Sequence, residues 1–504
     1  MNLKNIMTLG ELKKSNYQSL PIKDELRKNL IKSLQNNENP FNGILGYDDT
    51  VIPDIQTAIL SRHNIILLGL RGQAKTRIAR LLVNLLDEYI PVIEGSELND
   101  DPLNPLSKIA KDIINSNGDN TKISWLHRSE RYTEKLATPD VSVADLIGDV
   151  DPIKAASLKL PYSDERVIHF GLIPRSHRSI FVINELPDLQ ARIQVSLFNI
   201  LQESDIQIRG FKVRLPLDIQ FVFTANPEDY TNRGSIVTPL KDRIDSQILT
   251  HYPKTTEISK EITAQESVLS DDQKKTIVVN DLLKELIEHI AFAARTSEYI
   301  DPKSGVSARL TISAYENLIS TAERRRIING NKNTSVRISD LYGIIPAITG
   351  KVELVYEGEQ EGPFKVANIL ISKSIKTKFE EYFPSPDLVK KNAGNNPYNQ
   401  IVSWFGKGNN LDILNNINDS EYKKLLNSVP GLADIVKKYN PDTDTNTELL
   451  LMEFLLHGLA EYSLLSKLML ERGIQFKDML SSMFKMTTED DMDEDDFNQE
   501  DKYL

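Results

Sequence analysis

The sequence has 504 residues, 40% of them hydrophobic and 26% charged, which suits about three soluble globular domains. It has no cysteine, so disulfides, thiolate metal sites and a cysteine nucleophile are excluded. The net charge of −12 argues against a dedicated nucleic-acid binder, because phosphate contacts require lysine and arginine. The start of the chain has no apolar signal segment and the longest apolar run is Ile65–Leu70, so we expect a cytoplasmic protein without a membrane span.

Residues 41–255 show strands alternating with helices, a pattern typical of a parallel sheet in an α/β core. Residues 1–40 are polar and predict an N-terminal extension with one or two helices. A stretch near residues 96–120, rich in Asn, Asp, Ser and Pro, predicts an insert within the core. In chain order the expected elements are helix Asp54–Leu60, strand Asn64–Gly69, helix Thr76–Glu88, helix Pro105–Ile114, strand Ser179–Ile183, helix Leu189–Gln202, a hairpin of Ile206–Gly210 with Phe211–Leu215, and strand Ile219–Ala225.

The second half of the chain reads as helical. We expect a helical lid over residues 256–370 and a mainly helical C-terminal region over residues 371–486. Residues 487–504 carry many acidic side chains and a single lysine, which predicts a disordered tail, or alternatively a docking tail for a basic partner. The clearest predicted helices are Asp281–Arg295, Thr311–Ile328, Ser339–Ile348 and Thr447–Glu471.

A glycine-containing stretch lies between the predicted strand Asn64–Gly69 and the helix that follows it. Small residues there let backbone N–H groups surround phosphate oxygens, and the helix N-terminus adds a favourable dipole. Lys75 would neutralise the β- and γ-phosphates of ATP, and Thr76 would place its hydroxyl on Mg²⁺. Ala74 stands where glycine is usual, which is acceptable if its φ is negative. The predicted nucleotide-binding residues are Gly69, Arg71, Gly72, Gln73, Ala74, Lys75, Thr76 and Arg77.

Two later strands end in polar side chains that suit ATP hydrolysis. Asn184 and Glu185 follow the first of them. In phosphate-loop ATPases the first of these positions holds a water on Mg²⁺, and the second orients the attacking water. Asn184 offers an oxygen without a charge, so metal affinity would be weaker. Asn226 follows the strand Ile219–Ala225, and its amide would touch the γ-phosphate or the water.

The order of these motifs resembles the I subunit of magnesium chelatase and the related MoxR ATPases, in the helix-2-insert branch of the AAA+ proteins. The segments Asp145–Pro152 and His169–Ile173 look like the insert of this branch, which implies a second insert in the core near residues 138–173. Gly46-Tyr47 is similar to the adenine-side segment of the family. The resemblance covers roughly residues 40–350. The motifs that carry it are Ala74-Lys75-Thr76, Glu185, the hairpin, Thr224-Ala225-Asn226-Pro227 and Leu240-Lys241-Asp242-Arg243.

By this resemblance Arg243 is the arginine finger, which reaches the ATP of a neighbouring subunit and is worth roughly 10³–10⁵ in rate. The alternative for Arg243 is a surface ion pair with Asp242 or Asp245. Arg309, at the start of a predicted helix, resembles the sensor 2 arginine of the lid. Arg178 is a candidate for an inter-subunit contact or for a plain surface role.

Two polar positions complete the candidate set. Asn226 matches sensor 1 of the family. His169 is the histidine nearest to these motifs, and we expect it to pack rather than to react. The seven histidines are scattered singly and indicate no metal cluster.

The resemblance implies an ATP-hydrolysing motor that uses ATP and Mg²⁺, assembles into a ring, expected to be a hexamer, and remodels or loads a partner protein with a von Willebrand factor A domain. One alternative is the ATPase subunit of a true magnesium chelatase, although no porphyrin site is visible. Another is an ATP-binding switch with little hydrolysis, for which Asn184 is the motive. A helicase would need more than the small basic group Arg209, Lys212 and Arg214 on the hairpin, so we do not expect nucleic acid as a partner.

Overall fold

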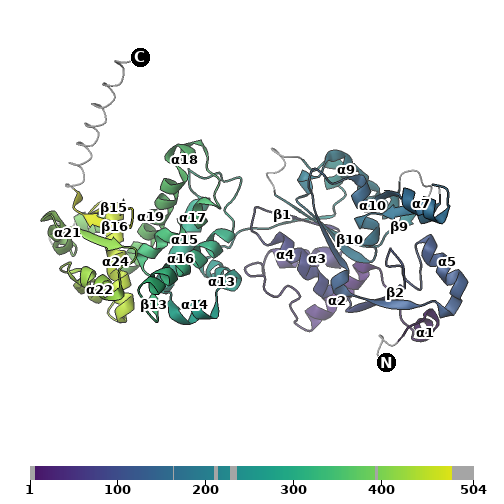
Figure 1. The fold of residues 1–504 in the computed structure, drawn as a ribbon, viewed down its shortest axis with the longest axis horizontal. Coiled ribbons are helices and arrows are strands. Elements are labelled where there is room, and N and C mark those ends of the chain that lie inside the picture. Colours follow the sequence, from purple (N-terminus) through teal and green to yellow (C-terminus); the bar gives the residue numbers. More distant parts are fainter. Residues whose placement is uncertain (1–5, 163, 209–213, 227–234, 392–395, 480–504) are drawn as a thin grey trace, which may run out of the picture. The chain divides into compact units, whose positions relative to one another are not determined.

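The computed structural model describes residues 6–162, 164–208, 214–226, 235–391 and 396–479. The chain divides between Tyr252 and Pro253 into two compact units, each with its own hydrophobic core (Figure 1).

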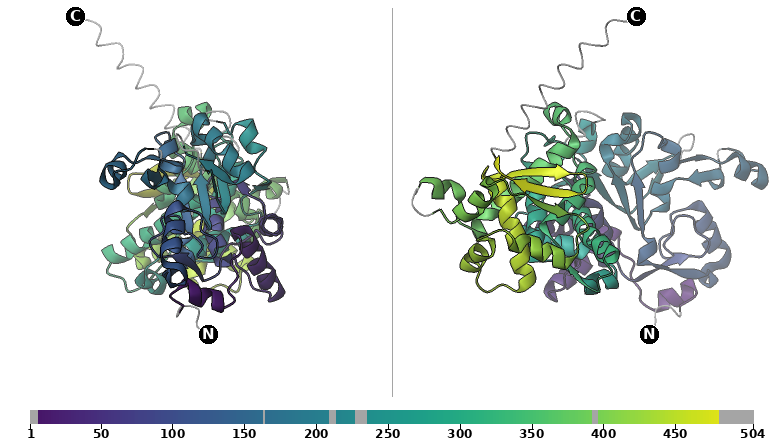
Figure 2. Two further views of the ribbon diagram at one scale, coloured as in Figure 1. Left: turned by 90° about the vertical axis from the view of Figure 1, so that its right-hand side faces the viewer. Right: turned by 60° about the vertical axis from the view of Figure 1, so that its left-hand side comes forward.

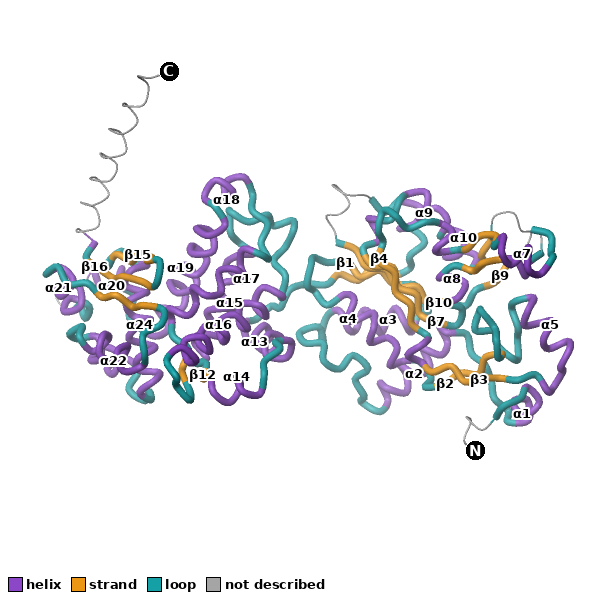
Figure 3. Tube along the Cα trace, in the orientation of Figure 1, coloured by secondary structure: helices purple, strands orange, loops and turns teal. Residues whose placement is uncertain are grey.

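The first unit is built on a parallel sheet of five strands in the order β11-β1-β10-β7-β4 (Figure 3, orange). Leu68 at the end of β1 pairs with Ala225 of β10 on one side and with Leu249 of β11 on the other. The carboxyl ends of these strands therefore meet at one edge of the sheet, where ligands bind in open parallel sheets. The strands are β1 (Ile65–Leu68), β4 (Tyr132–Leu136), β7 (Ser179–Asn184), β10 (Ile219–Ala225) and β11 (Ser246–Leu249).

Helices cover both faces of this sheet, which explains why its three central strands are buried along their whole length and are mostly apolar. Ile65 and Leu67 pack with α2, α3 and α4 on one face. Ile66 and Leu68 point the other way and pack with the residues of α9, α10 and the segment around β5 and β6. The α/β fold expected from the alternating pattern is confirmed.

The N-terminal helix α2 (Ile22–Gln35) is part of the first unit's core, through Ile22, Leu26 and Leu30. A buried ion pair adds to this contact. Both carboxylate oxygens of Glu25 accept hydrogen bonds from the Arg131 guanidinium, at 2.6 and 2.7 Å. Because removing one partner would leave a buried charge unpaired, we infer that α2 and the start of β4 are firmly joined.

The helix after the loop is shorter than the predicted helix Thr76–Glu88. The structure has α4 over Lys75–Leu81, a 3₁₀ turn over Leu82–Leu85 and then strand β2, Tyr89–Ile93. Strand β2 pairs antiparallel with β3, which lies beyond the first insert. The contact with a strand far along the chain ends the helix, and a local helical pattern does not contain that information.

Residues 209–213 of the predicted hairpin, which include the basic residues Arg209 and Lys212, lie outside the described residues. On either side of them, β8 and β9 form an antiparallel pair. In the insert, β5 and β6 also pair antiparallel, with α7 between them. The further elements of the first unit are α1 (Leu9–Lys14), α3 (Val51–Leu60), α5 (Lys108–Asn117), β3 (Ile123–His127), α6 (Val143–Leu146), β5 (Gly148–Val150), α7 (Pro152–Leu158), β6 (Ile168–Phe170), α8 (Leu172–Arg175), α9 (Ala191–Ser196), α10 (Phe198–Glu203), β8 (Asp205–Gln207), β9 (Arg214–Pro216) and α12 (Thr238–Lys241).

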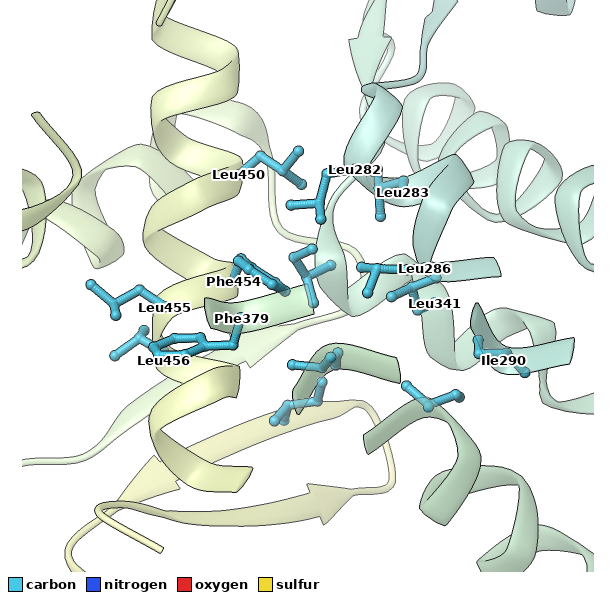
Figure 4. Packing of buried hydrophobic residues seen from close by; sticks show 14 of the residues in the cluster. Leu282, Leu283, Leu286, Ile290, Leu341, Phe379, Leu450, Phe454, Leu455 and Leu456 are labelled. Carbon is cyan, nitrogen blue, oxygen red and sulfur yellow. The ribbon is translucent and has the colours of Figure 1, made fainter. Parts of the chain in front are cut away.

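The second unit is mainly helical, and one apolar cluster runs through it from Ile277 to Phe476. Figure 4 shows Leu286 of α15, Phe379 of α19 and Phe454 of α24 side by side in this cluster. Its helices are α13 (Thr256–Glu266), α14 (Asp271–Thr276), α15 (Asp281–Arg295), α16 (Arg309–Ile328), α17 (Ile345–Thr349), α18 (Tyr356–Glu361), α19 (Pro363–Tyr382), α20 (Pro386–Lys391), α21 (Asn399–Gly406), α22 (Asp419–Asn427), α23 (Leu432–Tyr439) and α24 (Thr445–Glu461), with the short strands β12 (Ile277–Val278) and β13 (Thr334–Ser335).

The predicted helix Thr447–Glu471 is also too long. Helix α24 ends at Glu461, and Ser463 adopts a positive φ of 55°. The rest of the predicted helix forms strand β15 (Ser466–Leu470), which pairs with β16 (Gly473–Lys477), and β14 (Leu411–Leu414) completes the sheet (Figure 2, right, yellow). The predicted tail, residues 487–504, lies outside the described residues. In the parts of the chain that the structure describes, no helix has the length and apolar character needed to cross a membrane.

Candidate active site

The glycine-containing loop lies at the carboxyl edge of the sheet, between the inner strand β1 and helix α4. The backbone N–H of Gly69 donates to Ala225 O of the neighbouring strand β10 at 3.2 Å, which anchors the start of the loop. Gly72 has a φ of 73°, a left-handed conformation that glycine adopts without strain. Helix α4 begins at Lys75, so its free N–H groups face the loop and favour an anion there.

The ammonium group of Lys75 is buried and is surrounded by oxygen acceptors. Its Nζ donates to the carbonyl oxygen of Gly69, to Leu70 O at 3.1 Å and to Asn226 Oδ1 at 2.7 Å. A phosphate oxygen could replace these neutral acceptors with a charge-assisted bond, which is shorter and stronger. The loop and the end of β10 thus hold this cation where a phosphate group would meet it.

The polar residues after β7 and β10 form one hydrogen-bonded group. Asn226 Nδ2 donates to Glu185 Oε2 at 3.2 Å, so Asn226 lies between Lys75 and Glu185. The hydroxyl of Thr224 donates to Asn184 Oδ1 at 3.1 Å and accepts the backbone N–H of Glu185 at 3.1 Å. Glu185 itself has a φ of 56°, and this turn aims its side chain away from the strand direction.

The oxygens that could hold a cation are neutral. Thr76 Oγ1 donates to Asn184 Oδ1 at 3.4 Å, so the two predicted metal-side residues lie side by side. Within the described ranges, no group of three or more histidine, cysteine or acidic side chains could hold a metal ion alone. This set fits Mg²⁺, which is usually bound by one or two protein oxygens, several waters and the phosphates of the substrate.

The condition under which alanine at position 74 would be unstrained, a negative φ, is not met. Ala74 has φ 57° and ψ 14°, in the left-handed region, directly before the first residue of α4. The Cβ of alanine comes close to the following carbonyl oxygen in this conformation, at a cost of roughly 1–2 kcal/mol. The usual glycine at this position would avoid the cost, so the alanine is a source of local strain.

Replacement of Ala74 by glycine is expected to raise the free energy of unfolding of the first unit by about 0.5–1 kcal/mol, because relief of the left-handed strain exceeds the added freedom of the unfolded chain. Urea denaturation followed by circular dichroism measures this change. Gly72→Ala, at a φ of 73°, is the matched control and should destabilise by about 1 kcal/mol. A loss of stability in Ala74→Gly would contradict the strained conformation.

Among the other loop residues, Gln73 is buried, whereas Arg71 and Arg77 are exposed. The Gln73 side chain turns into the protein, where its Oε1 accepts the hydroxyl of Thr250 at 2.7 Å. Only the backbone of Gln73 is therefore placed to face a phosphate group.

Two sequence-based expectations outside the loop are wrong. Arg178 is buried and is neither a surface residue nor an inter-subunit contact, because its Nη1 donates to Pro91 O at 2.8 Å inside the unit. His169 does not pack, since it is exposed on the short edge strand β6, where its neighbours Ile168 and Phe170 take the buried positions. Strand alternation, which places successive residues on opposite faces, explains the second error.

The two predicted distal arginines lie in different units. Arg243, after α12, is partly exposed; its Nε donates to Gln202 Oε1 at 3.1 Å, and its guanidinium lies 4.9 Å from the Phe198 ring centroid. The alternative of an ion pair with Asp245 is not supported, because that carboxylate accepts the backbone N–H of Asn64 at 2.8 Å. Arg309 is the first residue of α16 in the second unit and is exposed.

Sequence reasoning missed Thr224 and Thr250, which support the site from inside. Thr224 links Asn184 to the backbone of Glu185, and Thr250 holds the Gln73 side chain. For Thr224 the available signal was a hydroxyl near the end of the buried strand β10, whereas Thr250 follows the partly exposed strand β11 and had no such signal. Such a group must find a hydrogen-bond partner when it is buried.

The five parallel strands with helices on both faces, and the loop of small residues between β1 and α4, form an α/β core of the phosphate-loop type. No protein-family model matches the sequence. Among solved structures, a proposed ATPase from Cytophaga hutchinsonii has 17% identity and a TM-score of 0.29, covering 72% of this chain and 98% of that one. A complex of the BchI and BchD subunits of magnesium chelatase has 18% identity and a TM-score of 0.33, and the match covers 64% of this chain and 98% of that one. NtrX from Brucella abortus in complex with ATP has 13% identity and a TM-score of 0.35, and the match covers 80% of this chain and 72% of that one.

Proposed function

We propose that this chain is the ATP-hydrolysing subunit of an oligomeric AAA+ motor that resembles the MoxR ATPases and the magnesium chelatase I subunit. The carrying observation is the hydrogen-bonded chain from Lys75 through Asn226 to Glu185 at the carboxyl edge of the sheet. The chain joins the Lys75 ammonium after β1, the Asn226 amide after β10 and the Glu185 carboxylate after β7. Such a group can sense a terminal phosphate and activate a water beside it.

In this mechanism the loop N–H groups and Lys75 bind the β- and γ-phosphates of ATP. Thr76 and Asn184 are the residues that would hold Mg²⁺, Asn184 through a water, and the ion would neutralise charge on the phosphate oxygens. Glu185 orients the attacking water and accepts its proton. Because Lys75 now contacts Asn226, a phosphate that draws Lys75 away also changes the bond from Asn226 to Glu185. Binding and water activation are thereby coupled.

The motor acts as a ring, expected to be a hexamer, in which Arg243 of one subunit completes the ATP site of the next. Arg243 is partly exposed, and two neutral partners and an aromatic ring hold its guanidinium, so it keeps its charge for a phosphate group. By the same resemblance, Arg309 is proposed as the sensor 2 arginine. The partner is a protein with a von Willebrand factor A domain, which the ring remodels or loads, and the location is cytoplasmic.

The test of this function is steady-state ATP hydrolysis per subunit as a function of protein concentration, in the presence of Mg²⁺. A site shared between subunits requires the specific activity to rise with concentration as rings assemble. Sedimentation of the same samples shows whether activity follows assembly. Full activity in the monomer would refute the shared site, although it would leave ATP hydrolysis itself intact.

A specific observation favours a second candidate, an ATP-binding switch with little hydrolysis. Asn184 Oδ1 already accepts from two hydroxyls, those of Thr76 and Thr224, and carries no charge for a cation. Mg²⁺ would therefore be held weakly. A true magnesium chelatase motor is a third reading of the same resemblance, and a genetic neighbour that encodes a large porphyrin-binding subunit would favour it.

Asn184→Asp separates the motor from the switch. The added charge is expected to lower the Mg²⁺ concentration for half-maximal ATPase activity by about tenfold, in line with the effect of groups around a metal. If turnover at saturating Mg²⁺ also rises strongly, the natural protein is a switch held back by Asn184. If turnover is unchanged, Asn184 gives no reason to propose a switch. Asn184→Ser, which keeps a neutral oxygen, is the control and should not lower the Mg²⁺ requirement.

A further inference from the structure

The side chain of Gln73, in the middle of the phosphate loop, is tied to the residue that follows β11. Thr250 Oγ1 lies 2.7 Å from Gln73 Oε1 and 3.2 Å from Leu68 O, and both Thr250 and Gln73 are buried. Gly69 makes room for this contact, since a Cβ there would lie 1.8 Å from Thr250 Oγ1 and 2.1 Å from Gln73 Oε1. The hydrogen bond between Thr250 and Gln73 therefore requires glycine at position 69.

Two tyrosine hydroxyls lie between the loop backbone and residues 250–252, one from Tyr252 itself and one from Tyr47. Tyr47 Oη donates to His251 O at 2.7 Å and lies 3.1 Å from Gln73 O. Burial raises the pKa of Tyr47 to about 12, so its hydroxyl remains a donor at neutral pH. Tyr252 Oη donates to Arg71 O at 3.0 Å. Loop residues 71 and 73 are thus each held by a group in or next to residues 250–252.

We propose that Tyr47, Thr250 and Tyr252 form a clamp that presets the phosphate loop for ATP and connects the loop to the segment leading into the second unit. The three hydroxyls contact the loop's carbonyl oxygens and the Gln73 side chain, and leave the loop N–H groups to bind phosphate. They are therefore positioning residues, which act on ATP through the loop. A loop that is already ordered loses less conformational entropy on binding a phosphate group, which increases affinity. Residues 250–252 directly precede Pro253, the first residue of the second unit.

This inference rests on the proposed nucleotide site, and the test separates the two. Thr250→Val removes the hydroxyl at nearly constant shape, and Thr250→Ser keeps it. With MgATP as the titrant in calorimetry, Thr250→Val is expected to bind roughly tenfold more weakly, because the buried Gln73 Oε1 loses its donor. Thr250→Ser should bind within about twofold of the natural protein. At saturating MgATP the kcat of Thr250→Val should be nearly unchanged, since the clamp acts on binding.

Amide hydrogen exchange without nucleotide gives a readout that a general loss of stability would not produce. Thr250→Val should exchange faster in the peptides covering residues 69–76 and 250–255, with the rest of the first unit unchanged, and MgATP should restore the protection. Tyr47→Phe, which keeps the ring, repeats the test if Thr250→Val does not fold. Natural affinity in both variants overturns the clamp, as does faster exchange over the whole unit. A natural protein that does not bind MgATP at all overturns the proposed function and the clamp together.

Discussion

Replacement of Glu185 by glutamine is expected to lower the rate of ATP hydrolysis by about 10²–10⁴-fold while ATP binding is retained. Glutamine has nearly the same shape and its Oε1 can still accept from Asn226, whose amide lies 3.2 Å from Glu185 Oε2. It cannot accept a proton from water. The backbone turn at Glu185, held by the hydroxyl of Thr224, does not depend on the side-chain charge. The substitution therefore changes the chemistry and preserves the geometry.

Phosphate release at saturating MgATP measures the rate, and calorimetry measures the binding. Glu203→Gln, at the exposed end of α10, is the control for a lost carboxylate and should keep the natural rate. A rate in Glu185→Gln within about threefold of the natural protein would assign the base to another residue. Loss of binding together with activity would instead show that the carboxylate holds the nucleotide or its metal.

Mixing two inactive variants is expected to restore activity. Lys75→Ala lacks the proposed phosphate-binding cation. Arg243→Ala lacks the proposed arginine finger, a group worth roughly 10³–10⁵ in rate. In a mixed ring, a subunit with intact Lys75 can receive Arg243 from a Lys75→Ala neighbour. With random assembly from equal amounts, about a quarter of the interfaces are complete, so about a quarter of the natural activity should return.

The measurement is ATP turnover of the two variants alone and after unfolding and reassembly together. Arg192→Ala, which removes an exposed arginine of α9, is the control and should be active without a partner. Activity of Arg243→Ala alone would show that the finger is another residue. Inactivity of every mixture, with assembly shown by sedimentation, would place both groups in the same subunit's site.

The sequence by itself determined the fold class and the residues that meet at the sheet edge. A buried strand followed by a small-residue loop and Lys75 is a local pattern, and so is a buried strand that ends in Asn184 and Glu185. Because parallel strands have their carboxyl ends at one edge, polar residues after different strands are brought together whatever their separation in the chain. Lys75, Asn226 and Glu185 meet for this reason.

The tertiary structure alone decided the features that depend on contacts between distant segments. The left-handed Ala74, the burial of Arg178 and the strand β15 in place of a helix all contradict local expectations. The clamp at Thr250 is a further case, because its partner Gln73 is far away in the sequence. Local propensity is a weak preference, and a buried hydrogen bond or a paired strand outweighs it once the chain has brought the partner within reach.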